Sequence, residues 1–395
     1  MLLLYISLSV GALFILFWCA QLLFLNLHLR WTNHIIQSDN EDAKTGVSII
    51  HPIKDIDFEL ERNLESWFRQ NYNGPIQHIF SFQSPDDPAI PIVRMIMENH
   101  PNMDCEITVN PVIPGLNGKS SNMVNGMKLA KYDIVLFGDS DIRIRQDFIV
   151  KMVRPLKNEK VGITTCGQIN IGGRDFWTRF FTFTQNTETD FTWAFLTKLG
   201  VDVGATGAAF AMRKSLLLEV GGLEAFGGSL LEDLHLGNTL YKMGYKLILG
   251  PFLECHVNKL AKEKSFNYAR RIGIGIKAHI ATELPMFIAM FFWYWAILLL
   301  GLAFRDPYVI YLSLMFMGLR VIHGVLMRVI TGNSIVLTDF VTPLFFDLFA
   351  TFYLIFSISN PYVTWRGIRY EVKKGGYIEE VDYVSEDLNE EEVKV

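Results

Sequence analysis

Cysteine is scarce in this chain, and the spacing of the few that occur excludes two kinds of architecture. The 395 residues contain four cysteines and no Cys-x-x-Cys pair. Disulfide-stapled small domains and structural zinc sites both need grouped cysteines, so neither is expected. Isolated cysteines also favour a reducing compartment for the middle of the chain. They lie at Cys19, Cys105, Cys166 and Cys255.

The chain also lacks a surplus of basic residues. The chain carries 36 Lys and Arg against 41 Asp and Glu, which gives a formal net charge of −5. The isoelectric point is near 6.0. A nucleic-acid-binding domain is expected to present a basic surface, so we do not expect nucleic acid as a partner.

Apolar residues, in contrast, are abundant and gather at the two ends of the chain. They make up 50% of it, and the mean hydropathy is +0.23. Residues 2–29 form an almost unbroken apolar run, longer than the ~20 residues that span a bilayer. A cleaved signal peptide is disfavoured, because the run lacks a basic leading region and a small-residue cleavage pattern. Arg30, His34 and Lys44 follow the run, and the positive-inside tendency therefore places the middle of the chain in the cytoplasm.

Further apolar segments occupy residues 285–304, 308–330 and 335–358, and the last two contain charges. If all of them crossed the membrane together with the first run, the C-terminus would lie opposite the middle of the chain. Basic residues follow the last segment, however, and such clusters prefer the cytoplasm. We therefore expect one segment, preferably the charged third, to be re-entrant or to lie in the interface. The charged residues are Arg320, His323, Arg328, Asp339 and Asp347 within the segments, then Arg366, Arg369, Lys373 and Lys374.

These patterns divide the chain into five parts. Residues 1–30 are expected to be a transmembrane helix, 31–46 a polar linker and 47–280 a cytosolic α/β domain. Residues 281–360 are expected to be transmembrane or interfacial helices, and 361–395 a tail that is first basic and then acidic. From Glu379 onward the tail is acidic enough to be disordered.

The middle part alternates short β-branched or apolar runs with segments of helical periodicity. Such alternation predicts a doubly wound sheet with right-handed crossovers and helices on both faces. Residues 176–195 are aromatic and show no clear periodicity. The expected strands are residues 47–52, 76–82, 105–109, 134–137, 161–165, 205–214 and 246–249, and the expected helices are 60–68, 90–97, 119–129, 148–153 and 230–243.

One strand ends on two carboxylates. Residues 134–137 are apolar, and Asp139 and Asp141 follow directly. Ligands of open α/β sheets bind beyond the carboxyl ends of strands. Two aspartates released there could hold a hard divalent cation, and that cation could hold a diphosphate. A simple polar turn is the competing interpretation, because short motifs often occur by chance.

Other motifs extend this pattern along the chain in a recognisable order. Together they resemble the ceramide glucosyltransferase family, glycosyltransferase family 21, whose members are membrane glycosyltransferases. The matching positions are the strand from Val47 to Lys54, Asp87 within residues 83–90, Lys119 with Asn122, Asp139, Thr206-Gly207, Met212 to Lys214, Gly221-Gly222, Glu232-Asp233, Trp365-Arg366 and Arg369-Tyr370.

This resemblance implies a GT-A catalytic domain, a nucleotide-diphospho-sugar transferase fold, between membrane helices. It implies an inverting transfer of a hexose from a UDP-sugar to the hydroxyl of a membrane lipid such as ceramide. Asp233 would be the general base. Asp87, Lys119, Asp139 and Arg271 would bind the UDP-sugar, while Asp139 and Asp141, with His256 as a candidate third ligand, would hold Mn²⁺ or Mg²⁺.

Taken alone, most of these residues have simpler interpretations. Asp87 suits a helix N-cap, and Lys119 could be a surface lysine. Glu232 and Asp233 suit the first turn of a helix, where negative charge is favourable. His256 could be satisfied in place after its strand.

Two departures from the family pattern leave the acceptor open. The family usually ends its catalytic domain with (Gln/Arg)-x-x-Arg-Trp, whereas here only the first basic residue remains, at Arg271. The second aspartate motif is Asp-Ser-Asp at Asp139 to Asp141, where ceramide enzymes can have Asp-Ser-Gly.

Several alternatives therefore stay open. A hopanoid or polyprenyl-lipid glycosyltransferase and a polysaccharide synthase are other enzymes that fit, and an inactive lipid- or nucleotide-binding scaffold or a transporter is an alternative of another class. The expected location is a bacterial inner membrane, or Golgi or ER membrane in a eukaryote. The sugar, the acceptor lipid and the oligomeric state are left undetermined.

Overall fold

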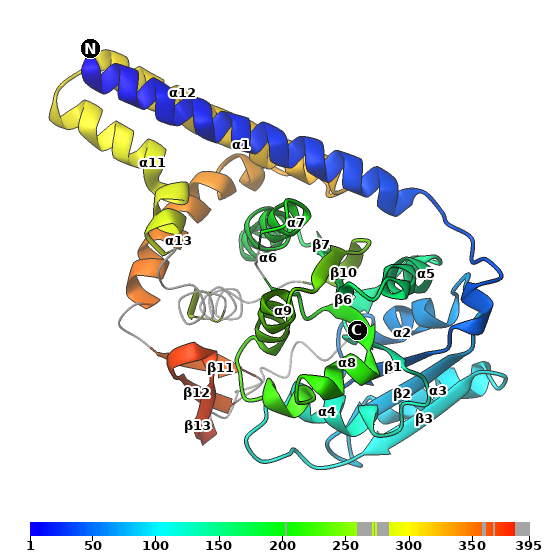
Figure 1. Ribbon diagram of the computed structural model, residues 1–395. Helices are drawn as coiled ribbons and strands as arrows, with labels where there is room; N and C mark the ends of the chain where they lie inside the picture. Colours follow the sequence, from blue (N-terminus) through cyan, green and yellow to red (C-terminus); the bar gives the residue numbers. More distant parts are fainter. Residues whose placement is uncertain are drawn as a thin grey trace.

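The structure of the chain is a computed structural model. It describes residues 1–201, 204–258, 271, 273–274, 284–357, 361–365 and 368–383 (Figure 1). An α/β domain with its sheet and surrounding helices occupies the middle of the chain, and long apolar helices from both ends of the sequence lie together beside it.

The α/β domain is built on a seven-stranded sheet with the order β3-β2-β1-β4-β8-β6-β9. The first four of these strands are parallel, as the sequence predicts. β8 differs, since it runs antiparallel to both β4 and β6. The strands are β1 (Val47–Pro52), β2 (Ile76–Phe82), β3 (Asp104–Val109), β4 (Ile134–Gly138), β6 (Val161–Thr165), β8 (Ala209–Arg213) and β9 (Lys246–Leu249).

Alternating side chains of β4 form the core on both faces of this sheet. Leu136 packs with Trp67 and Phe148 on one face. Phe137 packs with Met123 and with residues of the helix that follows Leu231 on the other face. The helices that cover the sheet are α2 (Leu60–Phe68), α3 (Ile90–Asn99), α4 (Gly118–Met127), α5 (Phe148–Val153), α8 (Lys214–Glu219) and α9 (Glu232–Lys242).

A second sheet, with the order β5-β10-β7, lies beyond the end of β4. Its strands are β5 (Ile142–Arg143), β7 (Gln168–Gly172) and β10 (Leu253–Val257). The sequence predicted no strand at β7 or β10. Both are five-residue strands with a polar side chain near their middle, so neither shows the apolar run that marks the strands of the main sheet.

A third sheet forms in the C-terminal part, where only a tail was expected. It contains β11 (Tyr362–Trp365), β12 (Ile368–Val372) and β13 (Ile378–Tyr383), in that order. Glu379 to Tyr383 therefore belong to a strand, and the expectation of disorder from Glu379 was wrong for these residues. The rest of the acidic tail, residues 384–395, lies outside the described residues. Most of residues 258–270 and the expected domain boundary at residue 280 lie outside them as well.

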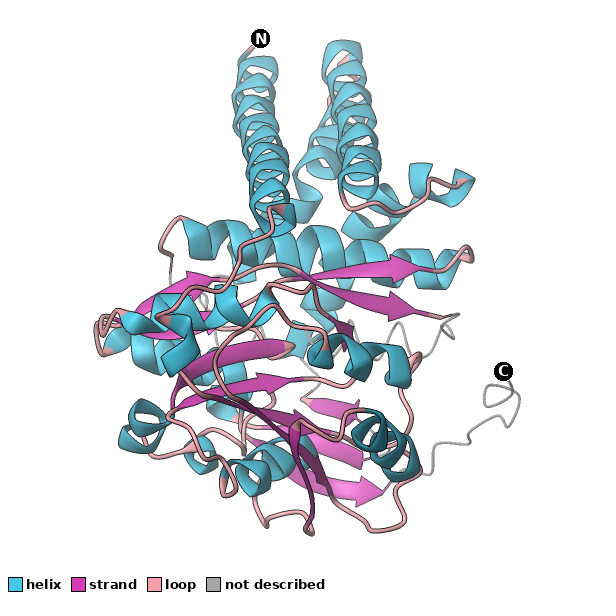
Figure 2. Ribbon diagram, turned by 90° about the vertical axis from the view of Figure 1, so that its right-hand side faces the viewer, coloured by secondary structure: helices cyan, strands magenta, loops and turns pink. Residues whose placement is uncertain are grey.

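The apolar helices form a layer that rises from the α/β domain (Figure 2). α1 (Leu2–Asn33) and α12 (Pro307–Ile330) are long and apolar enough to cross a membrane. Gly11 of α1 lets the ring of Phe316 approach closely, because a Cβ atom there would lie 2.0 Å from it. α11 (Leu284–Ala303) precedes α12, and the short helix η6 (Leu337–Phe340) and α13 (Thr342–Ser357) follow it.

The unassigned aromatic region is helical throughout. It contains α6 (Phe176–Phe183), the π-helix η3 (Thr184–Asp190) and α7 (Phe191–Lys198). α6 packs against α13 through rings that include Phe180, Phe345 and Phe346. This region therefore joins the α/β domain to the apolar helices.

Charged residues of the apolar segments are turned inward and paired. Arg320 donates to both oxygens of Asp347, at 2.7 and 2.9 Å. Arg179 of α6 pairs with Asp339, and the Nε atom of Arg328 lies 3.4 Å from the same carboxylate. Desolvated charges are tolerated when they are paired in this way. The charges thus connect helices to one another instead of facing lipid.

Candidate active site

Asp139 lies where β4 ends and β8 begins. Its backbone N–H donates to the carbonyl of Ala208 at 3.0 Å, because the antiparallel β8 starts beside the end of β4. The side chain of Asp139 is half-buried, while Asp141 is exposed two residues further on. Between them, Ser140 Oγ donates to Asp57 Oδ2 at 2.5 Å, which fixes this loop against the segment after β1.

Lys119 reaches Asp139 from the first turn of α4. Asn117 caps this helix, since its side chain accepts from Ser120 N at 2.8 Å. The Nζ atom of Lys119 lies 2.6 Å from Asp139 Oδ1 and donates to the carbonyl of Gly207 at 2.9 Å. Burial acts to lower the pKa of Lys119, but the charges of Asp139 and Glu232 outweigh it and raise that pKa. The interpretation of Lys119 as a surface lysine is therefore wrong.

Asp233 completes the group from the first turn of α9. A Cβ atom on Gly207 would lie only 2.8 Å from Asp233 Oδ2 and 3.4 Å from Lys119 Nζ. Glycine at this position thus allows Lys119, Asp139 and Asp233 to converge from three different elements. The sequence motifs pointed to all three residues. Nothing in the sequence predicted that the ammonium group of Lys119 would lie close to these carboxylates.

The carboxylates of Glu232 and Asp233 hold protons more tightly than ordinary carboxyl groups. Burial, followed by the charge of Asp233, raises the pKa of Glu232 to about 7. Burial also raises the pKa of Asp233, although the positive charge of Lys119 opposes this. A carboxylate whose pKa is raised towards neutrality is suited to accept a proton from a hydroxyl group.

Asn122, one turn after Lys119, supports the other side of the site. Its side-chain amide donates to the carbonyl of Ile53 at 3.0 Å, at the end of β1. One face of α4 therefore contacts the ends of β1 and β4 together. This explains the Lys-x-x-Asn spacing, which places both residues on one side of a helix.

Asp87 holds two backbone segments together. Its carboxylate accepts from Asp55 N at 3.1 Å and from Ala89 N at 3.0 Å. The second bond lies just before α3, but the N-cap of that helix is Ala89 and no side chain caps it, so the helix-capping interpretation is wrong. The first bond fixes the loop after β1, so Asp87 also shapes the edge of the sheet at which β1 ends.

His256 lies on β10, close to the second carboxylate of the Asp-Ser-Asp motif. Cys255 pairs with Ile142, so His256 and Asp141 lie at the same end of this antiparallel pair. His256 Nε2 is 3.1 Å from Glu254, and its Nδ1 is 4.0 Å from Glu59. Among the residues that the structure describes, no group of three or more His, Cys, Asp or Glu side chains is arranged to hold a metal ion.

Arg271 is described only as part of a short helical segment. Ile274 of that segment is buried with Leu230, two residues before Glu232, and with strands of the third sheet. The segment therefore packs beside the start of α9. Arg270 lies outside the described residues.

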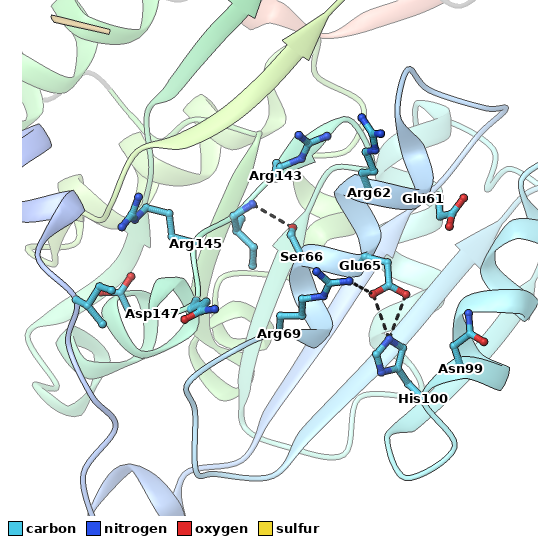
Figure 3. Close-up of a pocket in the computed structure, with 13 residues that line it drawn as sticks. Glu61, Arg62, Glu65, Ser66, Arg69, Asn99, His100, Arg143, Arg145 and Asp147 are labelled. Atoms are coloured by element: carbon cyan, nitrogen blue, oxygen red, sulfur yellow. Dashed lines mark hydrogen bonds and ion pairs between the residues drawn. The ribbon is translucent and has the colours of Figure 1, made fainter. Parts of the chain in front are cut away.

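A cavity lies away from this group. It measures about 930 Å³ and lies along the outer side of α2, where Arg62, Arg69, Arg143 and Arg145 approach it (Figure 3). Arg69 and His100 contact Glu65 there. Arg143 also pairs with Glu59 at 2.8 Å, and sequence reasoning predicted no role for either residue. None of the predicted site residues lines the cavity.

A comparison with protein families shows to which family the chain belongs. A family model described as glycosyl transferase family 21 matches residues 11–378. The chain belongs to this family. The family prediction is therefore confirmed: the chain is a glycosyltransferase, and its α/β domain is a GT-A domain accompanied by apolar helices.

Individual relatives are similar over different lengths. Ceramide glucosyltransferase 1 of Caenorhabditis elegans is 29% identical over 348 residues, which cover 84% of this chain and 73% of that protein. Ceramide glucosyltransferase of Candida albicans is 38% identical over 117 residues, which cover 27% of this chain and 22% of that protein. Among solved structures, the mannosyltransferase PcManGT from Pyrobaculum calidifontis, in complex with GDP-Man and Mn²⁺, is 17% identical with a TM-score of 0.47. That alignment covers 90% of this chain and 97% of that one.

Proposed function

We propose that this glycosyltransferase moves a hexose from a UDP-sugar to the hydroxyl group of a membrane lipid such as ceramide, with inversion at the anomeric carbon. The observation that carries the proposal is the convergence of Asp233, Lys119 and Asp139 around Gly207. The names of the relatives suggest ceramide as the acceptor and glucose as the sugar.

Asp233 acts as the general base. It takes the proton of the acceptor hydroxyl while that oxygen forms a bond to the anomeric carbon. The bond from this carbon to the diphosphate oxygen breaks, and its electron pair leaves with UDP. Asp233 suits this role because it lies at the start of α9 with a raised pKa and is held next to a glycine, where a substrate can approach.

Lys119 supplies positive charge on the leaving-group side. Its ammonium group already neutralises Asp139, at 2.6 Å, and its high pKa keeps it charged at neutral pH. An ammonium group in a poorly solvated site stabilises the charge that develops on a departing diphosphate. We propose that Arg271, three residues before the Ile274 that packs with Leu230, also contacts the diphosphate. Asp87 is proposed to contact the uracil or ribose.

The donor set also fits a hard divalent cation. Asp139 and Asp141 provide carboxylate oxygens two residues apart at a strand end, and Mg²⁺ is commonly held by one or two carboxylates together with substrate phosphates. Asp139 and Asp141 would hold Mn²⁺ or Mg²⁺ together with the phosphates of the substrate, whereas His256, which lies 3.1 Å from Glu254, does not form a group of three with them. The bound ion would supply Lewis-acid stabilisation of the leaving diphosphate.

Membrane attachment accounts for the lipid acceptor. α1 exposes apolar side chains along its length, among them Leu13, Leu16 and Leu23, although it packs against α12. Such a surface is stable in a bilayer and unfavourable in water. Because a ceramide-like alcohol keeps its tails in the bilayer, its hydroxyl would meet the α/β domain at the membrane surface, on the cytosolic side.

Product analysis tests the proposal. Purified protein in lipid nanodiscs is incubated with a panel of labelled UDP-sugars and with ceramide, hopanoid or polyprenyl acceptors, and the lipids are analysed by mass spectrometry. We expect a single-hexose ceramide from a UDP-hexose. A hexosylated hopanoid or polyprenyl lipid would replace ceramide as the acceptor, and a polymer would overturn the single transfer. UDP-sugar binding without any transfer to the panel would favour a scaffold.

A further inference from the structure

The turn between β12 and β13 contacts the loop that leads into the Asp233 helix. We call residues Lys373–Ile378 the C-terminal turn, and residues 227–231 the entry loop. The backbone of Leu230 donates to the carbonyl of Gly376 at 2.7 Å, and that of Ile378 donates to the carbonyl of Gly228 at 2.8 Å. The buried Ser229 adds a bond from Oγ to Gly376 O at 3.3 Å. The turn therefore pairs with the entry loop almost as a neighbouring strand would.

The other side of the entry loop contacts the start of the Lys119 helix. Asn117, the N-cap of α4, donates its backbone N–H to Gly227 O at 2.9 Å and its side-chain amide to Ser229 O at 3.3 Å. A Cβ atom on Gly227 would lie 2.8 Å from Ser120 Cβ, so the two backbones are in close contact. The entry loop is thus held between α4 and the C-terminal turn.

Aromatic rings extend this contact into α9 itself. The ring of Tyr377 lies edge-on to His235, with centroids 5.7 Å apart. On its other side, His235 meets the ring of Phe226 at 5.3 Å. His235 lies two residues after Asp233, in the same helical turn. Such ring pairs stabilise an arrangement beyond the area that they bury.

We propose that the C-terminal turn is a positioning element for Asp233, and that Tyr377 is its positioning residue. The inference rests on the proposed function, in which Asp233 removes the proton of the acceptor. A displaced catalytic group costs rate steeply, because the reacting atoms must meet within a narrow range of distance and angle. Tyr377 restrains α9 near Asp233, while the turn fixes the entry loop that starts the helix.

Two properties make Tyr377 a suitable point to test. Its side chain is 45% exposed, so its removal leaves no large cavity in the core. It belongs to the turn between β12 and β13, whereas Lys119 and Asp139 are placed by α4 and β4, so donor binding should be spared. Val381 of β13 is 44% exposed and offers a matched control on the same hairpin.

The experiment compares Tyr377→Ala, Tyr377→Phe and Val381→Ala in the full-length protein in nanodiscs. For Tyr377→Ala we expect kcat for transfer to fall about 10- to 100-fold, with KM for the UDP-sugar and the melting temperature nearly unchanged. Tyr377→Phe, which keeps the ring, should restore kcat, and Val381→Ala should behave as wild type. Unchanged kcat in Tyr377→Ala, or a fall in kcat matched by a rise in donor KM, would overturn the inference.

Hydrogen exchange provides a readout that does not depend on transfer. Peptides that cover residues 227–235 should exchange faster in Tyr377→Ala than in wild type, and at the wild-type rate in Tyr377→Phe and Val381→Ala. If exchange is unchanged in Tyr377→Ala, the positioning role is wrong whatever the protein transfers. If wild-type protein transfers nothing, the proposed function is refuted. The role of the turn is still decided by the exchange experiment, because that measurement does not depend on transfer.

Discussion

Gly207 controls how close the charged side chains of the site can come. Lys119, Asp139 and Asp233 come from α4, the end of β4 and α9, and a side chain at position 207 would crowd Asp233 and Lys119. Each residue alone has an ordinary structural explanation. The site thus combines two negative groups, Asp139 and Asp233, with one positive group, Lys119. This combination suits a reaction that moves a proton on one side and a diphosphate on the other.

Substitution of Asp233 separates chemistry from binding. In Asp233→Asn the amide cannot accept the proton, so we expect kcat to fall by about 10²- to 10⁴-fold. Binding of the UDP-sugar, measured by calorimetry, should remain close to wild type, because Lys119 and Asp139 are intact. Equal losses of transfer and donor binding would remove Asp233 from the role of base.

The pH profile should report the Glu232–Asp233 pair. Because burial and the charge of Asp233 raise the pKa of Glu232 to about 7, the pair takes up its first proton as the pH falls towards 7. Burial also raises the pKa of Asp233, so the charged base is lost as the pair takes up its second proton at lower pH. We expect kcat/KM to fall on this acidic side. In Glu232→Gln the first of these protonations is gone, so the acidic limb should report Asp233 alone and move to lower pH. A limb that stays in place would show that Glu232 does not influence the base.

Removal of divalent cations tests Asp139 and Asp141. With EDTA we expect transfer to stop and to return on addition of Mn²⁺ or Mg²⁺, because two carboxylates next to a diphosphate need a cation between them. Activity assays over a metal series give the measurement. In Asp141→Asn a higher metal concentration should be needed for half-maximal rate. Full activity in EDTA would show that transfer needs no divalent cation at Asp139 and Asp141.

At the scale of elements, the main sheet was predictable and the connections around it were not. Residues 76–82, 161–165 and 246–249 were expected to be strands and form β2, β6 and β9 with the same bounds. These runs are apolar and bounded by turn residues, so the local sequence pattern is enough to predict the strands. Residues 176–198 show no single helical period, because the aromatic helix α6, which packs against α13, is followed by the polar π-helix η3.

The site was predictable as a set of motifs but not as a set of contacts. Asp139 and Asp233 stand out in the sequence because Asp139 follows an apolar strand directly and Asp233 lies in the first turn of a helix. Contacts between residues far apart in sequence hold the site together. They are the bond from Lys119 to Asp139, the bond from the Asp55 backbone to Asp87, and the pairing of the C-terminal turn with the entry loop. Such contacts depend on how elements pack, for which one sequence carries no local signal.

The ion-pair cluster of Arg179, Arg328 and Asp339 should be essential for stability. Asp339→Asn removes one carboxylate and leaves two buried guanidinium groups without their partner. Loss of one member of a buried pair typically costs about 3–5 kcal/mol. We therefore expect a clear drop in the thermal midpoint of the protein in detergent. Glu159→Gln, at an exposed position, is the control, and equal midpoints for the two variants would contradict a stabilising role.

At the scale of the whole molecule, both ends of α13 are held to the α/β domain. Asn333, before the helix, donates to Asn170 O of β7 at 3.2 Å, and the strands after it reach the entry loop. A helix held at both ends to one domain cannot cross a bilayer that the domain does not cross. We therefore propose that α1, α11 and α12 span the membrane and that α13 lies on the domain's side of it.

Labelling of single cysteines in sealed vesicles tests this arrangement. Leu199 belongs to the α/β domain, Arg305 separates α11 from α12, and Ser334 precedes α13. With a membrane-impermeant maleimide, Leu199→Cys and Ser334→Cys should react from the same side, and Arg305→Cys from the opposite side. Variants at Leu199 and Ser334 that react from opposite sides would mean that the chain crosses an odd number of times between these positions.

The pairing of the C-terminal turn with the entry loop also dictates when the enzyme can first act. Chains fold from the N-terminus as they leave the ribosome, yet the last contact around the Asp233 helix comes from Gly376 and Ile378, after every apolar helix has been made. A nascent chain therefore completes its base only once its membrane helices have been synthesised and can insert. Chains that still lack the C-terminal turn would hold an unfinished site, so transfer would begin only after the apolar helices have been made.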